Sequence, residues 1–127
     1  MNSIQKWTVL GIVAAVALFA QNPGITRTIV KTQDVSGGHQ AIIATVTIAP
    51  GASARRHTHP GEEISYVIEG EGEVLIDGQP PLHIKAGDGF VIPAGAIHDA
   101  RNTGTVPIKL AAVYYVEKGK PFATPAN

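Results

Sequence analysis

Beyond residue 24, the chain consists of short β-rich runs separated by Gly, Pro, Asp and Asn, with no stretch showing the 3.6-residue period of an amphipathic helix. In the segment 41–51, the even-numbered residues from Ile42 to Ile48 are apolar, and they alternate with Ile43 and two threonines. A period of two places alternate side chains on opposite faces of a strand. We expect strands at 25–30, 41–51, 63–70, 73–78, 82–84, 89–95, 97–102 and 107–116, and a loose end at 117–127. Many short strands at this spacing predict an all-β fold, an antiparallel sandwich or barrel.

The first twenty residues differ in kind from the rest of the chain. A short polar start carries only Lys6 as a charge, an uncharged apolar run occupies 7–20, and Gln-Asn-Pro-Gly then breaks the pattern. This arrangement is typical of a secretory signal peptide, and the run is shorter than the ~20 residues of a membrane-spanning helix. We therefore expect cleavage after Ala20, a periplasmic or secreted protein, and no membrane association after cleavage. The remaining 21–127 form one domain, with its core from about 42 to 115.

Composition excludes some partners and limits how the fold is stabilised. Ten basic and ten acidic side chains cancel among the 127 residues, so the chain lacks the basic footprint of nucleic-acid binding. The chain has no cysteine, although small exported domains often rely on disulfides. Packing must stabilise the domain, together with metal binding or self-association. We expect a homodimer, with the strand at 25–30 and the face that carries Tyr66 as candidate contacts.

Four side chains suggest a metal site. His57 and His59 lie one residue apart in an extended segment, so both imidazoles point to the same side of a sheet. Pro60-Gly61 permits a turn, after which Glu63 begins the returning strand. A closed barrel could bring His98 to the same place from a distant strand. Any one of these residues alone is more often structural, but three imidazoles and one carboxylate together suit a divalent transition ion: Fe, Mn, Ni, Cu, Co or Zn.

Two segments around these residues match the paired motifs of the cupin superfamily at every defining position. The first contains Gly51, His57, His59, Glu63 and Gly70, and the second contains Gly87, Pro93, Gly95, His98 and Asn102. The chain therefore resembles the small single-domain cupins of the quercetin-dioxygenase-like type. This resemblance implies a double-stranded β-helix, or jelly roll, with a metal in the mouth of the barrel. It also implies that His57, His59, Glu63 and His98 are the metal ligands.

Alternation of side chains along each strand predicts which residues lie beside these ligands. Arg55 shares a face with His57, which makes it a candidate contact for an anionic substrate, although an arginine at a strand end is more often solvated. Ser65 shares a face with Glu63, whereas Tyr66 lies on the opposite one. Ala100 and Asn102 are expected on the inner face with His98, and Asp99 and Arg101 on the outer face. We expect Asn102 to form hydrogen bonds with a turn or the backbone. The remaining candidates are read as surface residues: Glu62, His39 and His83.

The fold hosts many chemistries, so function depends on the site. The first hypothesis is a metal-dependent enzyme that acts on a small organic molecule, foremost a dioxygenase-like oxidoreductase, with Glu63 as ligand and catalytic base. A lyase or isomerase that uses the metal as a Lewis acid remains open. The alternative is a non-catalytic module that binds or senses a metal or small ligand. A purely structural role does not require an open four-ligand site.

Overall fold

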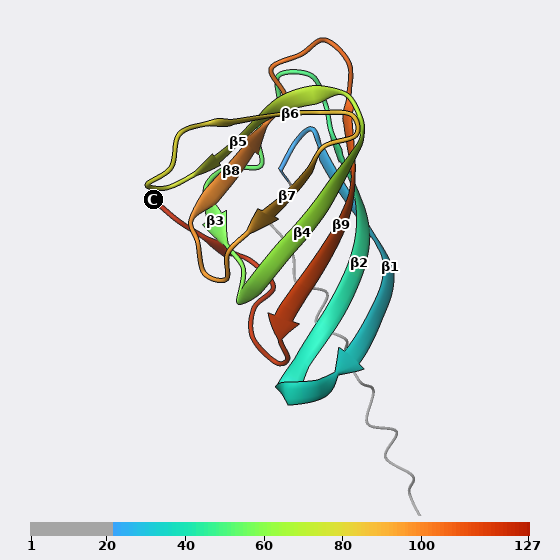
Figure 1. The fold of residues 1–127 in the computed structure, drawn as a ribbon, viewed down its shortest axis with the longest axis vertical. Coiled ribbons are helices and arrows are strands. Elements are labelled where there is room, and N and C mark those ends of the chain that lie inside the picture. The colour runs from blue at the N-terminus through green and yellow to red at the C-terminus, as the bar shows by residue number, and fades with distance from the viewer. Residues whose placement is uncertain (1–21) are drawn as a thin grey trace, which may run out of the picture.

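Two five-stranded antiparallel sheets make up residues 22–127, the part of the chain that this computed structural model describes. The first sheet has the order β1 (Ile25–Val35), β2 (His39–Ile48), β9 (Ile108–Glu117), β4 (Gly61–Glu69) and β7 (Gly89–Ile92). The second has the order β10 (Thr124–Pro125), β3 (His57–Thr58), β8 (His98–Arg101), β5 (Glu71–Ile76) and β6 (Leu82–Lys85). The chain crosses repeatedly between the two sheets (Figure 1), which confirms the predicted all-β jelly roll.

The prediction of a signal peptide falls on residues that lie outside this described part. In the first sheet, β1 and β2 are joined by a short 3₁₀ turn, η1 (Ser36–Gly38). Across residues 22–127, no helix has the length and hydropathy of a membrane span.

The alternation read from the sequence decides which side chains form the core. Along β2 the even-numbered residues from Ile42 to Ile48 are buried, whereas Ile43 is 42% exposed on the outer face. One cluster of buried side chains fills the space between the sheets: Ile42, Ala44, Val46, Ile48, Val67, Val74, Ile84, Phe90, Ile92, Ile108, Leu110, Ala112, Tyr114 and Val116. Complete burial of a large apolar side chain contributes about 1.5–3 kcal/mol. This packing stabilises a chain that has no disulfides.

Most predicted strands are confirmed, but two boundaries are wrong for physical reasons. β1 continues to Val35 because residues 31–35 pair in register with β2, although their sequence lacks apolar alternation. The tail at 117–127 is not a loose end, since Thr124 and Pro125 pair with Thr58 and His57. Backbone pairing forms both the end of β1 and β10, and neither has a hydrophobic pattern from which it could be predicted.

The start of β4 depends on a glycine. A Cβ atom on Gly61 would lie 1.8 Å from the backbone oxygen of Tyr115, so only glycine allows β4 to approach β9 this closely. From that start, the register places Glu63 opposite Tyr114 of β9 and Ile92 of β7. The glycine therefore helps to place the Glu63 carboxylate inside the barrel.

Candidate metal centre

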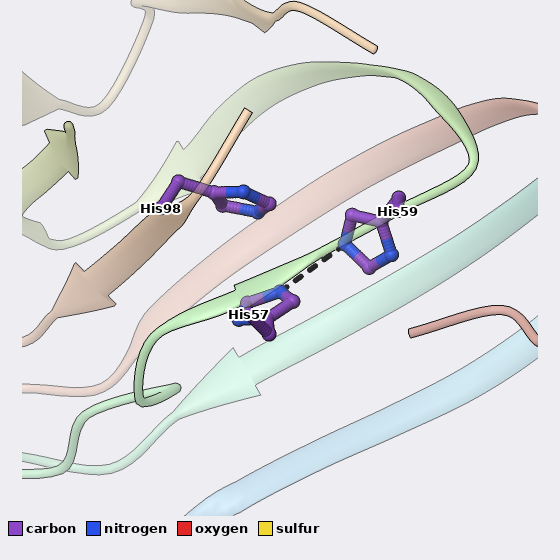
Figure 2. Close-up of side chains that lie close together, drawn as sticks. All are labelled: His57, His59 and His98. Atoms are coloured by element: carbon purple, nitrogen blue, oxygen red, sulfur yellow. Dashed lines mark hydrogen bonds between the residues drawn. The ribbon is translucent and has the colours of Figure 1, made fainter. Parts of the chain in front are cut away.

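Three imidazole rings meet at one end of the barrel interior. His57 in β3 pairs directly with His98 at the start of β8, and His59 follows β3 by one residue. The ring centroid of His57 lies 4.8 Å from that of His59 and 4.2 Å from that of His98. One ligand atom from each histidine lies within 4.8 Å of the others. Figure 2 shows the three rings turned toward a common point, as the predicted site requires.

The backbone selects the tautomer of each neutral ring. Nδ1 donates to a carbonyl oxygen in all three histidines: His57 to Arg55 at 2.7 Å, His59 to Phe122 at 2.7 Å, and His98 to Ala96 at 2.9 Å. A carbonyl can only accept, so the proton of each neutral ring lies on Nδ1 and the lone pair on Nε2. The Nε2 atoms of His57 and His59 face each other at 3.2 Å. Histidines that bind metals are oriented in this way by hydrogen bonds from the other ring nitrogen.

The carboxylate of Glu63 completes the group. Its Oε2 lies 3.5 Å from Nε2 of His59 and 3.2 Å from Nε2 of His98. Its other oxygen, Oε1, accepts a hydrogen bond of 3.1 Å from Oγ of Ser65, which holds the carboxylate in place. All four residues predicted as ligands therefore lie together, and Ser65 shares the face of Glu63 as expected.

An ion among these atoms would satisfy a polar atom that the protein leaves unpaired. Nε2 of His98 is buried and has no hydrogen-bond partner among residues 22–127, because its contact with Glu63 does not have hydrogen-bond geometry. Buried polar atoms are rarely left in this state. Three imidazole nitrogens and one carboxylate form a donor set for a divalent first-row transition ion, so the residues present fit such a metal.

The surroundings favour the protonation states that bind a metal. The pKa of His57 is lowered to about 4, mainly by burial, and the neighbouring His98 and His59 act in the same direction. Burial alone would raise the pKa of Glu63, but the contacts with His59 and His98 outweigh it and hold that pKa well below its usual range. Burial and the charge of Glu63 raise the pKa of Tyr114 to about 12. At neutral pH the pocket therefore holds a neutral His57, an ionised Glu63 and a protonated Tyr114.

A pocket opens over these groups. It contains about 370 Å³ of empty space, including its opening to solvent. Its polar lining consists of Arg27, His57, Glu63, His98 and Tyr114, and the remaining lining is apolar, from Ile25 in β1 to Leu110 in β9. Three of the four predicted ligands, His57, Glu63 and His98, thus border this opening.

The structure places Arg55 differently from the sequence expectation. Arg55 has a left-handed backbone, with φ of 65°, and lies outside β3. The alternation that would align its side chain with His57 is therefore interrupted, and this part of the expectation is wrong. The side chain is exposed and does not line the pocket, while its backbone oxygen binds His57. A contact between Arg55 and substrate stays a prediction.

Three groups at the site were missed by the sequence reasoning: Arg27, Tyr114 and Phe122. Arg27 lines the pocket from β1, and its period-two relation to the half-buried Ile25 was the signal that could have found it. Phe122 lies in the tail, where its ring is 4.8 Å from the ring of His59 and 4.6 Å from that of Tyr114. The carbonyl that Phe122 gives to His59 is backbone, so no side-chain pattern could predict it.

The other nominated residues mostly lie as expected. Ala100 lines the pocket, and Asn102 bonds the backbone through Nδ2, at 2.9 Å from Ile48 O and 2.7 Å from Val106 O. Asp99 does not line the pocket, but it is buried rather than solvated, because Ser53 Oγ donates to it at 2.8 Å and Arg101 Nε at 3.1 Å.

Three residues read as surface groups lie away from the histidine cluster. Glu62 is half-buried, His39 stacks on Tyr115 with a centroid distance of 4.4 Å, and His83 lies exposed beside Glu71.

Comparisons with known proteins agree with this geometry. Residues 44–114 match the family model described as Cupin domain. The chain is 43% identical to an acireductone dioxygenase of Rhodopseudomonas palustris over 63 residues, which are 47% of this chain and 37% of that protein. It is 42% identical to the dimethylsulfoniopropionate lyase DddQ of Ruegeria pomeroyi over 45 residues, which are 35% of this chain and 22% of the lyase.

A solved structure extends the likeness to the fold. A recombinant oxalate oxidase in complex with glycolate is 26% identical, with a TM-score of 0.66, over 84% of this chain and 57% of that one. The chain thus spans less than two thirds of the length of each of these three proteins. Since the family model covers more than half of the chain and includes all four predicted ligands, the chain belongs to the Cupin domain family.

Proposed function

We propose that this protein is a metal-dependent enzyme that acts on a small organic molecule, with dioxygenase-type chemistry as the first candidate. One observation carries the proposal: His57, Glu63 and His98 line an open pocket rather than a closed site. Structural metal sites are usually closed by protein ligands, whereas catalytic sites keep a position open to substrate. The similarity to a dioxygenase, a lyase and an oxalate oxidase supports an enzyme but does not select the reaction.

The four ligands and the residues of the pocket have different chemical roles. A divalent ion held there would act as a Lewis acid or redox centre with coordination positions left for substrate oxygens. The apolar walls limit the entry of water. Tyr114 keeps its phenolic proton at neutral pH and can donate a hydrogen bond into the pocket. Glu63 is ionised and held through Oε1 by Ser65, while Oε2 faces Nε2 of His59 and His98 at the metal position. To act as a base, Glu63 would use Oε2 after this oxygen detaches from the ion.

The test begins with metal-free protein, prepared with a chelator and reloaded separately with Fe, Mn, Co, Ni, Cu or Zn. Oxygen uptake and product formation are then followed with catechols, flavonols, diketones and hydroxy acids. We expect turnover with at least one ion and none without metal. In Glu63→Gln, the amide keeps the shape of the side chain and turnover falls by at least about 100-fold if the carboxylate is the base. Equal activity in Glu63→Gln removes Glu63 as the base, and binding of these compounds without turnover favours the non-catalytic module.

A further inference from the structure

Arg27 brings a positive charge to the pocket from a strand outside the family motifs. Of the described residues that line the pocket, it is the one with a permanent positive charge. It lies in β1 opposite Val46 of β2, and it precedes the segment 44–114 that matches the family model. The shared motifs therefore do not require an arginine at this position.

The guanidinium is held next to the ligand cluster by aromatic rings. Nε of Arg27 donates to the hydroxyl of Tyr114 at 3.3 Å. Its Cζ lies 5.6 Å from the ring centroid of Tyr114 and 5.2 Å from that of Phe122. The ring of Tyr114 is in turn 4.9 Å from the ring of His59. One aromatic ring therefore separates the guanidinium from a predicted ligand, and two rings restrict its orientation.

The charges of the pocket favour an anion. Glu63 is the only carboxylate among the described lining residues, and the histidines are neutral when their Nε2 atoms bind a metal. Counting only these described residues, a divalent ion held against one carboxylate would leave one positive charge, to which Arg27 adds a second. Charges in a partly buried, apolar pocket interact more strongly than in bulk water. A guanidinium also matches the geometry of a carboxylate, with two parallel hydrogen bonds.

We infer that Arg27 determines specificity by pairing with the carboxylate of a small substrate that carries a second oxygen, as a 2-hydroxy or 2-oxo acid does. The second oxygen then faces the metal position, and the apolar walls contact the remaining carbon atoms. This inference rests on the proposed function, since it names the substrate class of the same pocket. It assigns to Arg27 the role that the sequence suggested for Arg55.

The experiment measures binding rather than turnover. Cobalt-loaded protein is titrated with lactate and with lactamide, its uncharged isostere, by calorimetry and by the cobalt absorption spectrum. Wild-type protein is expected to bind lactate more tightly than lactamide. Arg27→Gln should weaken lactate binding by about 10- to 100-fold, since it removes a charge-assisted pair, and should leave lactamide binding unchanged. Arg27→Lys keeps the charge without the planar fork and should lie between the two. Arg56→Gln is the matched control and should bind lactate like the wild type, because this exposed side chain pairs with Asp77 and does not line the pocket.

Equal lactate affinity in wild type and in a folded, cobalt-loaded Arg27→Gln would overturn the inference, as would equal binding of lactate and lactamide by the wild type. Should Arg27→Gln fail to fold, wild-type lactate affinity in Arg27→Lys would have the same meaning. Turnover by the wild type of a neutral substrate, and of no hydroxy or keto acid, would overturn the inference and leave the proposed function intact. Lactate binding that depends on Arg27, without turnover of any hydroxy or keto acid, would support the inference and contradict the proposed enzyme.

Discussion

The backbone oxygen of Phe122 accepts a hydrogen bond of 2.7 Å from Nδ1 of His59, which links the C-terminal segment to a predicted ligand 63 residues earlier. The same segment pairs with β3, so it borders the site through both its backbone and its aromatic ring. The geometry of His59 therefore depends on residues outside the family motifs.

Removal of residues 121–127 should lower metal affinity by about 10- to 100-fold, the effect typical of losing a group that orients a ligand. Competition titration with a chelator measures this change, and circular dichroism checks that the barrel remains folded. Phe122→Ala is the matched control, because it keeps the carbonyl and removes only the ring. Its affinity should lie closer to the wild type. A folded truncated protein with unchanged affinity would show that the hydrogen bond does not orient His59.

Metal-free protein should become less stable as the pH falls from about 6.5 to 4. The pKa of His57 is about 4 in the folded protein, below its ordinary value of 6.5, so in this range the unfolded chain binds a proton that the folded chain does not. The lowered pKa of Glu63 acts with the same sign below its ordinary value of 4.5. Urea unfolding in the presence of a chelator at several pH values measures the slope. His57→Gln should flatten it between pH 6.5 and 4.5, and equal slopes in the two proteins would contradict the assignment.

We propose that the protein forms a homodimer through the outer face of the first sheet. Register places Ile43, Val113, Ile64 and Val91 in one row across β2, β9, β4 and β7. Ile64 is 48% exposed, Val91 57% and Tyr66 53%, so this row and Tyr66 present an apolar surface. Light scattering at micromolar concentration should give twice the mass of the chain, and Ile64→Lys should give a monomer. Leu82→Lys, an exposed site on the second sheet, should remain dimeric. A monomeric wild type would refute the proposal.

We also propose that the first twenty residues direct export and are then removed. N-terminal sequencing of protein isolated from cells should find a chain that begins near Gln21. Val13→Arg places a charge in the apolar run and should retain the unprocessed chain, whereas Ser3→Ala should be processed normally. A wild-type protein that begins at Met1 would show that the segment is not a signal peptide.

The sequence could predict the strands and the four predicted ligands because both leave a pattern in side chains. Period-two alternation in β2 places Ile42 and Ile48 in the core, and the spacing of His57, His59, Glu63 and His98 marks the cluster. The groups that orient the three histidines were hidden because they are backbone carbonyls. Arg55 was wrongly assigned to the pocket face. Alternation of side chains holds only within a strand, and the left-handed backbone of Arg55 interrupts it. Arg27 was missed because its period-two relation to Ile25 indicates only its face, and its role follows from the pairing of β1 with β2.

The most direct test of the metal centre is elemental analysis of the purified protein. We expect one divalent transition ion per chain in the wild type and at least about a tenfold lower content in the His59→Ala, His98→Ala double variant. His83→Ala removes an exposed histidine outside the cluster and should keep the full metal content. Full occupancy in the double variant would contradict the account.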